Sequence, residues 1–151
     1  MIIIRDTREK IGLWDFEFFG YQTNVACLKT GDYSLLGYEN TFCIERKKST
    51  SEIATNVGKD RKRFEAELLR MKDFTDKYLI LEFSVADLLQ FPINSGLTKE
   101  QQKKVRMNPQ FIMKRLNEYE EEYGIEIIFA GNKENAMEVA LDIMKEVYEK
   151  V

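Results

Sequence analysis

The segment 31–47 constrains the fold more than any other part of this chain. It opens with Gly31-Asp32 and closes with Glu45-Arg46-Lys47, and two strand-like runs lie between these ends. Side chains alternate along a strand with a period of two, so Glu45 and Lys47 share one face. A hairpin return would bring Asp32 beside Glu45. The sequence therefore predicts two carboxylates and an ammonium group on one face, a set that suits a hard cation and a substrate phosphate.

The same spacing has an ordinary alternative explanation. An acidic residue two positions before a lysine is common on the solvated face of any strand. The pattern Asp…Glu-x-Lys is weak by itself, and its interpretation depends on the residues that flank it.

Three motifs occur in a fixed order along the first ninety residues or so. Gly31-Asp32-Tyr33 followed by Glu45-Arg46-Lys47 resembles the GD…ERK signature of XPF-type nucleases, a branch of the PD-(D/E)XK superfamily. Residues 2–9 (IIIRDTRE) resemble the opening strand and the D-x-R-E element of that family, and residues 61–69 (RKRFEAELL) resemble the helix after the ERK strand. One position departs from the pattern: the acidic residue usually found four positions after the lysine is Ser51 here, with Glu52 next.

The resemblance implies a restriction-endonuclease-like α/β/α sandwich with a central mixed sheet. Strands and helices also alternate through the second half of the sequence, which favours an α/β sandwich independently. At 151 residues the chain is long enough for one domain with a real core, so we expect a single domain over 1–151.

The predicted site contains five residues. Asp32 and Glu45 would hold Mg²⁺ or Mn²⁺, with Asp6 or Glu9 completing or supporting the shell. Lys47 would stabilise charge on the scissile phosphate or help to deprotonate the attacking water. Asp6 and Glu9 enter through the D-x-R-E resemblance, because without it a polar turn with an Arg–Glu pair explains the segment 6–9 as well.

Charge is unevenly distributed, although the formal net charge is only −3. The segments 46–63 and 99–115 are basic, whereas the tail from Asn117 is acidic. This polarity fits a protein with one basic side for phosphates and an acidic back, while solvated helix faces explain either patch alone. The residues that we expect to contact DNA are Arg8, Arg46, Lys48, Arg61 and Arg63.

The absence of histidine from the sequence excludes Ser-His-Asp and Cys-His hydrolases and histidine-dependent nucleases. Acid–base chemistry must then use carboxylates, lysine, tyrosine or metal-bound water.

The two cysteines, Cys27 and Cys43, lack a zinc-type spacing, so we expect buried thiols in a reducing compartment. No signal peptide is visible and no apolar run approaches the ~20 residues of a membrane span, which favours an intracellular protein, cytoplasmic or nucleoid-associated.

Hydrophobic periodicity predicts the other elements. The aromatic segment 11–22 is either core or a stacking platform for an unpaired base, and the basic run 99–106 is either mobile or ordered only on a ligand. Expected strands are 1–5, 24–29, 77–83 and 125–130, and expected helices are 50–57, 60–73, 86–89, 109–123 and 133–150.

Three functions are compatible with these features. The first is a metal-dependent DNA endonuclease, for which the resemblance implies branched, flap or fork DNA as substrate. The second is a catalytically inactive DNA-binding or scaffold module of the same fold, although inactive relatives have generally lost the GD and ERK residues. The third is an interaction domain whose acidic last helix binds a partner. The family also implies a homodimer or a partner protein, and the apolar faces of the last two helices are either that interface or core.

Overall fold

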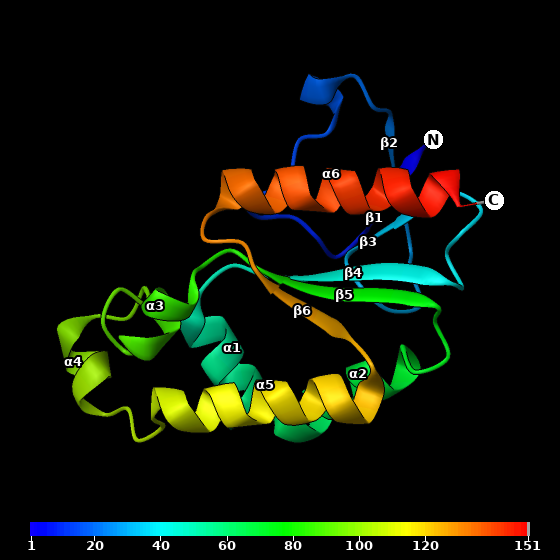
Figure 1. Cartoon of the computed structure of the whole chain (residues 1–151). Coiled ribbons are helices and arrows are strands. Elements are labelled where there is room, and N and C mark those ends of the chain that lie inside the picture. Colours follow the sequence, from blue (N-terminus) through cyan, green and yellow to red (C-terminus); the bar gives the residue numbers. More distant parts are fainter. Residues whose placement is uncertain (151) are drawn as a thin grey trace.

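The centre of the molecule is a six-stranded mixed sheet (Figure 1), seen in a computed structural model that describes residues 1–150. Its order is β2-β1-β3-β4-β5-β6. The β1–β3 and β3–β4 pairs are antiparallel, and the β1–β2, β4–β5 and β5–β6 pairs are parallel. The strands are β1 (Ile3–Asp6), β2 (Thr23–Ala26), β3 (Tyr33–Leu35), β4 (Phe42–Lys47), β5 (Asp76–Leu81) and β6 (Glu126–Phe129).

Helices cover both faces of the sheet, which confirms the predicted sandwich. The long helix α6 (Lys133–Glu149) crosses one face, where the short 3-10 helix η1 (Glu17–Phe19) also lies (Figure 1). The opposite face carries α1 (Thr50–Val57), α2 (Arg61–Arg70), α3 (Val85–Leu89), α4 (Lys99–Lys103) and α5 (Pro109–Tyr123). Two apolar clusters fill the two interlayer spaces, so that β4 and β5 are buried from both sides.

Helix α1 starts only three residues after Lys47, and local hydrogen bonds fix this start. The Ser49 hydroxyl accepts a hydrogen bond from the Glu52 N–H at 3.2 Å, as expected of a serine at a helix N-cap. The Glu52 carboxylate accepts one from the Lys48 N–H at 2.8 Å. Glu52 therefore stabilises the junction between β4 and α1, and the ERK strand passes directly into a helix.

The aromatic segment near the N-terminus divides between core and surface. Trp14 and Phe16 are buried and pack around Tyr33, so the prediction of core packing holds for them. Phe18 and Phe19 in η1 are exposed, because η1 stands clear of the sheet at the top of Figure 1.

Two expectations from the sequence need correction. Cys27 is exposed rather than buried, because β2 is an edge strand that ends at Ala26; Cys43 is buried. The helix expected over 60–73 ends at Arg70. The apolar faces of α5 and α6, for which a dimer interface and core were both open, pack onto the sheet as core. Within residues 1–150 no helix combines the length and apolarity needed to cross a membrane.

Candidate active site

The structure brings Asp32 and Glu45 together as predicted. Asp32 lies just before β3, and its N–H donates to the Ile44 carbonyl at 2.8 Å. The Arg46 N–H in turn donates to Asp32 Oδ2 at 2.8 Å. These two bonds hold Asp32 against β4, where its carboxyl group lines the same cavity as that of Glu45.

Gly31 makes this close approach possible. Its φ of +83° lies in the left-handed region, and a Cβ at this position would lie 2.9 Å from Cys43 Cβ and 3.3 Å from the Ile44 carbonyl oxygen. A side chain at position 31 would push the turn away from β4. The glycine of the GD motif thus sets the distance at which its aspartate meets Glu45.

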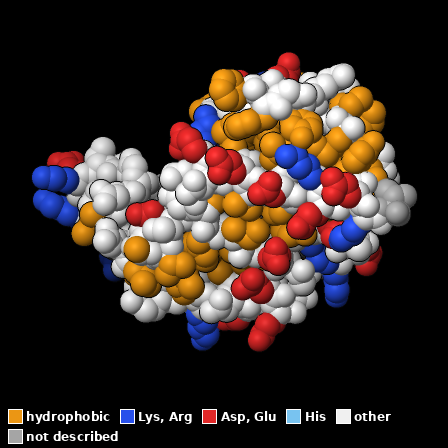
Figure 2. Space-filling view, turned by 45° about the horizontal axis from the view of Figure 1, so that its top comes forward, with side chains coloured by type: hydrophobic (Ala, Val, Ile, Leu, Met, Phe, Trp, Pro, Cys, Tyr) orange, Lys and Arg blue, Asp and Glu red, His pale blue; other side chains and the backbone are white. Residues whose placement is uncertain are grey.

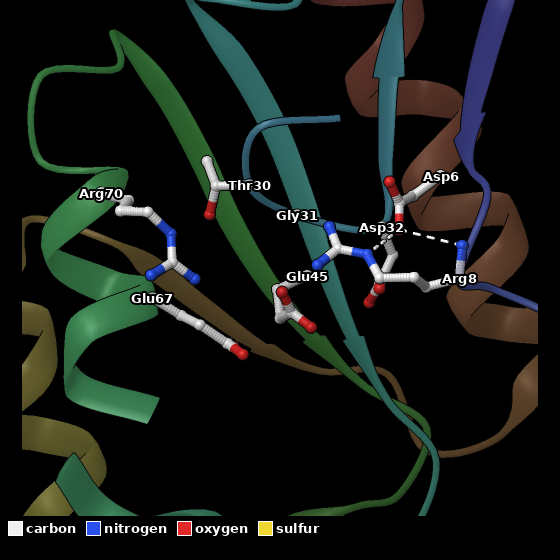
Figure 3. A pocket seen from close by; sticks show the side chains of 8 residues that line it. All are labelled: Asp6, Arg8, Thr30, Gly31, Asp32, Glu45, Glu67 and Arg70. Atoms are coloured by element: carbon white, nitrogen blue, oxygen red, sulfur yellow. Dashed lines mark hydrogen bonds and ion pairs between the residues drawn. The ribbon is translucent and has the colours of Figure 1, made fainter. Parts of the chain in front are cut away.

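The two carboxyl groups open into a cavity of about 170 Å³ (Figure 3). Asp6 and Arg8 from the end of β1 lie on one side of it, and Glu67 and Arg70 from α2 lie on the other. The full lining is Asp6, Arg8, Thr30, Gly31, Asp32, Glu45, Glu67 and Arg70.

Sequence reasoning missed Glu67 and Arg70. The apolar stripe of Phe64, Leu68 and Met71 was visible, and its burial turns one face of α2 toward the sheet. Glu67 and Arg70 are three residues apart beside that stripe, which places them on one flank of the helix. The available signal was therefore a polar pair flanking the stripe, but which flank faces the carboxylates depends on how α2 docks.

Burial and the neighbouring Asp32 carboxylate raise the pKa of Glu45 well above its ordinary value. Lys47 forms an ion pair with Glu45: its Nζ lies 3.6 Å from Glu45 Oε1 and 5.2 Å from the centroid of the Phe64 ring. Burial alone would lower the pKa of Lys47, but Glu45, Glu52 and the other nearby carboxylates outweigh burial and raise it. Lys47 is therefore an ammonium at neutral pH, which fits charge stabilisation and disfavours the predicted alternative of deprotonating water.

Asp6 lines the cavity with its oxygens already engaged. Its carboxylate accepts hydrogen bonds from the Leu28 N–H at 2.8 Å, the Arg8 N–H at 3.1 Å and Arg8 Nε at 2.7 Å. Burial alone would raise the pKa of Asp6, but these bonds outweigh it and lower the pKa. Asp6 thus holds the exposed guanidinium of Arg8 at the cavity, and its predicted role as a metal ligand stays a prediction.

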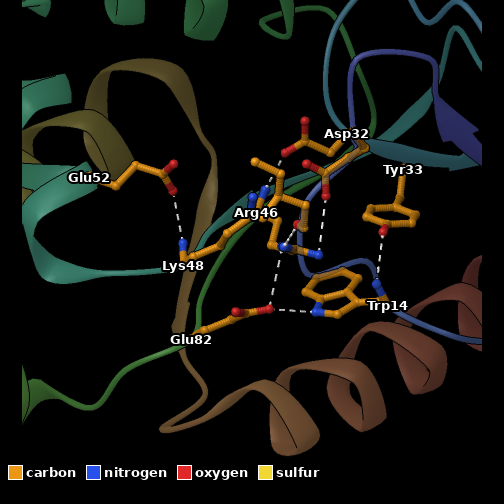
Figure 4. Close-up of polar contacts among 9 residues, drawn as sticks. Trp14, Asp32, Tyr33, Arg46, Lys48, Glu52 and Glu82 are labelled. Atoms are coloured by element: carbon orange, nitrogen blue, oxygen red, sulfur yellow. Dashed lines mark hydrogen bonds and ion pairs between the residues drawn. The ribbon is translucent and has the colours of Figure 1, made fainter. Parts of the chain in front are cut away.

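Arg46 points to the other face of β4, and its predicted role as a DNA contact is wrong for this reason. Its side chain is fully buried, with Nη1 3.2 Å from Glu9 Oε2 and Nε 3.4 Å from Glu82 Oε2 (Figure 4). These are ion-pair distances without the alignment of hydrogen bonds, whereas Nη2 donates a good hydrogen bond to the Ile11 carbonyl at 2.9 Å. The guanidinium also lies 5.3 Å from the centroid of the Trp14 ring, and Trp14 Nε1 donates to Glu82 at 2.6 Å.

Glu9 belongs to this buried network and does not line the cavity. Burial, followed by the charge of Asp32, raises its pKa. The sequence-based placement of Glu9 among the catalytic residues is corrected accordingly, because Arg46 holds its carboxylate beneath β4. Its contribution is to tie the segment after β1 to the strand that carries Glu45.

The remaining predicted DNA contacts lie outside the cavity. Lys48 is half-buried at the start of α1. Arg61 and Arg63 are exposed at the N-terminal end of α2, in loose surface pairs with Glu65 at 3.7 Å and Asp60 at 3.6 Å. At 1.5 Å per residue, Arg61 lies about 13 Å along the helix axis from Arg70. These arginines are free to meet a phosphate, but at a distance from the carboxylate pair.

The donor set fits a hard divalent cation bound mainly by water and substrate. Within residues 1–150 no three or more Asp, Glu or Cys side chains converge in a ready-made metal cage. Mg²⁺ usually keeps several waters and binds through one or two carboxylates plus substrate phosphates. The paired oxygens of Asp32 and Glu45, open to a cavity, provide this kind of site.

A mixed sheet between two helical layers, with a carboxylate pair and an ammonium group on its central strands, defines the class of restriction-endonuclease-like domains. The sequence model of the ERCC4 domain matches residues 5–142. The chain therefore belongs to the ERCC4 domain family, and the predicted relationship to XPF-type nucleases is confirmed. No curated protein matches the sequence.

Two solved structures share the fold. XPF from Aeropyrum pernix superimposes with a TM-score of 0.74 at 16% identity, over 99% of this chain and 66% of that chain. XPF from Aeropyrum pernix in complex with DNA gives a TM-score of 0.72 at 16% identity, over 98% of this chain and 65% of that chain. The chain thus spans just under two thirds of the length of these structural relatives, and the likeness establishes the six-stranded α/β fold.

Proposed function

We propose that this domain is a divalent-metal-dependent DNA endonuclease that hydrolyses a phosphodiester. The observation that carries the proposal is the convergence of the buried carboxyl group of Glu45 and the half-buried one of Asp32 at a single cavity, with the Lys47 ammonium 3.6 Å from Glu45. Two like charges in contact are unfavourable, and a cation relieves them. A cavity that gathers such a pair beside an ammonium suits a metal ion and an anionic substrate together.

Each group has a defined task. Asp32 and Glu45 hold Mg²⁺ or Mn²⁺, which when bound lowers the pKa of water and offsets charge on the phosphoryl oxygens. The Lys47 ammonium stabilises negative charge that develops on the scissile phosphate. Arg8 and Arg70 stand on opposite sides of the cavity, where their guanidinium groups suit the non-bridging oxygens of a phosphodiester.

DNA is the proposed substrate for two reasons. The cationic residues outside the cavity, Arg61 and Arg63, lie along the helix that also lines it, which suits a polymer with regularly spaced phosphates. One structural relative, XPF from Aeropyrum pernix, is described in complex with DNA. The family resemblance further favours branched, flap or fork DNA.

Cleavage of labelled DNA with and without metal tests the proposal. With Mg²⁺ or Mn²⁺ we expect nicking of fork and flap DNA, and with EDTA we expect none, measured on denaturing gels against a blunt duplex and a single strand of equal length. Binding of the same substrates in EDTA without cleavage in either metal would contradict the proposal and favour an inactive DNA-binding module.

As the pH is lowered, metal affinity should begin to fall at a higher pH than it would at a glutamate with an ordinary pKa. A metal ion binds the ionised carboxylate and so competes with the proton. Because the pKa of Glu45 is raised above 4.5, affinity is greatest above the raised pKa and falls by about tenfold per pH unit below it. Isothermal titration with Mn²⁺ over about pH 5 to 8 measures this dependence. Asp32→Asn should bind more weakly and shift the fall to lower pH, and an affinity that stays constant over the whole range would contradict the assignment.

A further inference from the structure

A groove of about 360 Å³ lies between α1 and the segment that joins α3 to α5. Its floor is largely apolar, and its rim carries the cations Lys59, Lys104 and Arg106. None of the described residues that line it is acidic. The floor consists of Ala54, Phe91, Leu97, Val105 and Met107, with Ser51 and Thr55 on the α1 side.

Two basic runs, far apart in sequence, meet at the groove. The α4–α5 connection docks against the end of α1, where the terminal methyl of Met107 packs on Gly58 in the space that a Cβ would occupy. Figure 1 shows α1, α4 and α5 together on the side of the sheet opposite α6. The two basic segments are separate along the chain, and the fold joins them into one surface.

The three rim cations lack internal partners. Lys59, Lys104 and Arg106 are exposed, and within residues 1–150 none of them forms an ion pair. In Figure 2, lysines and arginines gather at the tip of the lobe that contains α4, while acidic side chains spread over the face that carries α6. An anionic ligand would therefore meet attraction at the groove and repulsion on the opposite layer.

The surface continues beyond the groove at both ends. Lys59 also borders a hollow lined by the basic start of α2, residues 61–63, together with Asp60, which pairs with Arg63. Arg106 and Met107 border a further hollow with Phe111, whose exposed ring lies 5.2 Å from the Arg115 guanidinium. Cations therefore recur from the start of α2 to the start of α5, and apolar side chains accompany them from the groove to Phe111.

An apolar floor between cations suits unpaired DNA better than duplex DNA. A duplex stacks its bases inside and offers a protein surface mainly phosphates and sugars, so an apolar floor contributes little to its binding. An unpaired strand exposes both base faces and phosphates, and single-strand sites combine apolar or aromatic platforms with a positive groove. We propose that this groove binds an unpaired DNA strand, with bases on the floor and phosphates on Lys59, Lys104 and Arg106. The proposal rests on the nuclease function above and names the part of the substrate held outside the cavity.

The position of the groove suits this task. Helix α1 forms one wall, and it starts three residues after Lys47. Its eight residues extend about 12 Å at 1.5 Å per residue. An unpaired DNA strand bound in the groove therefore lies within the length of this short helix from the carboxylate pair. The junction where that DNA strand joins a duplex would then lie beside the cavity.

Binding measured without metal tests the groove separately from catalysis. Fluorescence anisotropy in EDTA compares a blunt duplex with the same duplex carrying a single-stranded overhang, over a series of salt concentrations. The groove variant is Lys104→Ala/Arg106→Ala, and the control is Lys133→Ala/Lys150→Ala, which removes the same charge from the two ends of α6. Thermal melting checks that both variants fold.

The groove variant should bind the overhang DNA about tenfold more weakly. Its salt dependence should become shallower by about 1.4, because two single-strand phosphate contacts are lost. Its affinity for the blunt duplex should change less than about twofold, and the control variant should match the wild type on both DNAs. An equal loss on both DNAs, or no loss on either, would overturn the proposal.

A small phosphodiester separates this inference from the proposed chemistry. Thymidine 5′-(4-nitrophenyl phosphate) is too short to extend from the cavity to the groove, so its Mn²⁺-dependent hydrolysis should be the same for wild type and groove variant. Hydrolysis that drops in the groove variant would contradict the assignment of Lys104 and Arg106 to strand binding. If neither the wild type nor the groove variant hydrolyses this ester or DNA, the nuclease proposal fails. The groove assignment stands in that case if the wild type still binds the overhang DNA more tightly than the blunt duplex.

Discussion

Glu45→Gln is expected to abolish metal-dependent cleavage of fork DNA, with a rate lower by roughly a thousandfold or more. The amide removes one of two oxygen anions that hold the cation, and metal ions contribute several kcal/mol to such reactions, at about tenfold per 1.4 kcal/mol. Single-turnover cleavage on denaturing gels measures the loss. Glu126→Gln makes the same chemical change at an exposed position on β6 and should cleave like the wild type.

The same variant should be more stable than the wild type when metal is absent. A raised pKa means that the folded state disfavours ionised Glu45, so stability declines as pH rises from the ordinary pKa toward the raised one. At neutral pH the neutral amide avoids this cost, and the melting temperature should rise. Added Mn²⁺ should then stabilise only the wild type. Cleavage within about tenfold of wild type, or a lower melting temperature with normal cleavage, would refute the proposed role of Glu45.

Arg46→Ala should lower the free energy of unfolding by about 3–5 kcal/mol, the range for breaking a buried charge pair. The change leaves the carboxylates of Glu9 and Glu82 in the interior without their cation and removes the guanidinium from the Trp14 ring. Urea denaturation measures the loss. Arg63→Ala is the matched control, because its side chain is 74% exposed and its partner Asp60 is 36% exposed, so that its effect should stay within about 1 kcal/mol.

A second variant separates lost charge from lost packing at this position. Arg46→Met combined with Glu9→Gln and Glu82→Gln removes all three charges and keeps most of the volume, and it should recover most of the stability lost in Arg46→Ala. If Arg46→Ala lowers the free energy of unfolding by less than about 1 kcal/mol, the stabilising role of the buried Arg46 ion pairs is contradicted.

The carboxylate pair could be predicted from the sequence because its geometry is local. The period of two along β4 places Glu45 and Lys47 on one face, and a single hairpin register brings Asp32 opposite. The capping of α1 and the end of α5 at Gly124 were predictable for the same reason, since residues within one turn determine them.

The errors concern contacts between elements that are distant in sequence. Alternation placed Arg46 on the face opposite Glu45, but it could not reveal that Trp14 and Glu82 close over that face and leave no route to DNA. Glu67 and Arg70 enter the cavity through the docking of α2, which no local pattern encodes. The groove lies between α1 and the α3–α5 connection, two segments whose contact follows only from the assembled fold.

The short connection between β4 and α1 has a mechanical consequence. Only Lys48 and Ser49 separate the strand from the helix, and Glu52 fastens this link from within the first helical turn. The hydrogen bond from the Lys48 N–H to Glu52 ties the residue next to Lys47 to the first turn of α1. If DNA binds along α1 as proposed, the groove and the Lys47 ammonium are therefore held in one rigid unit, and the distance between them is set by the fold rather than by the ligand.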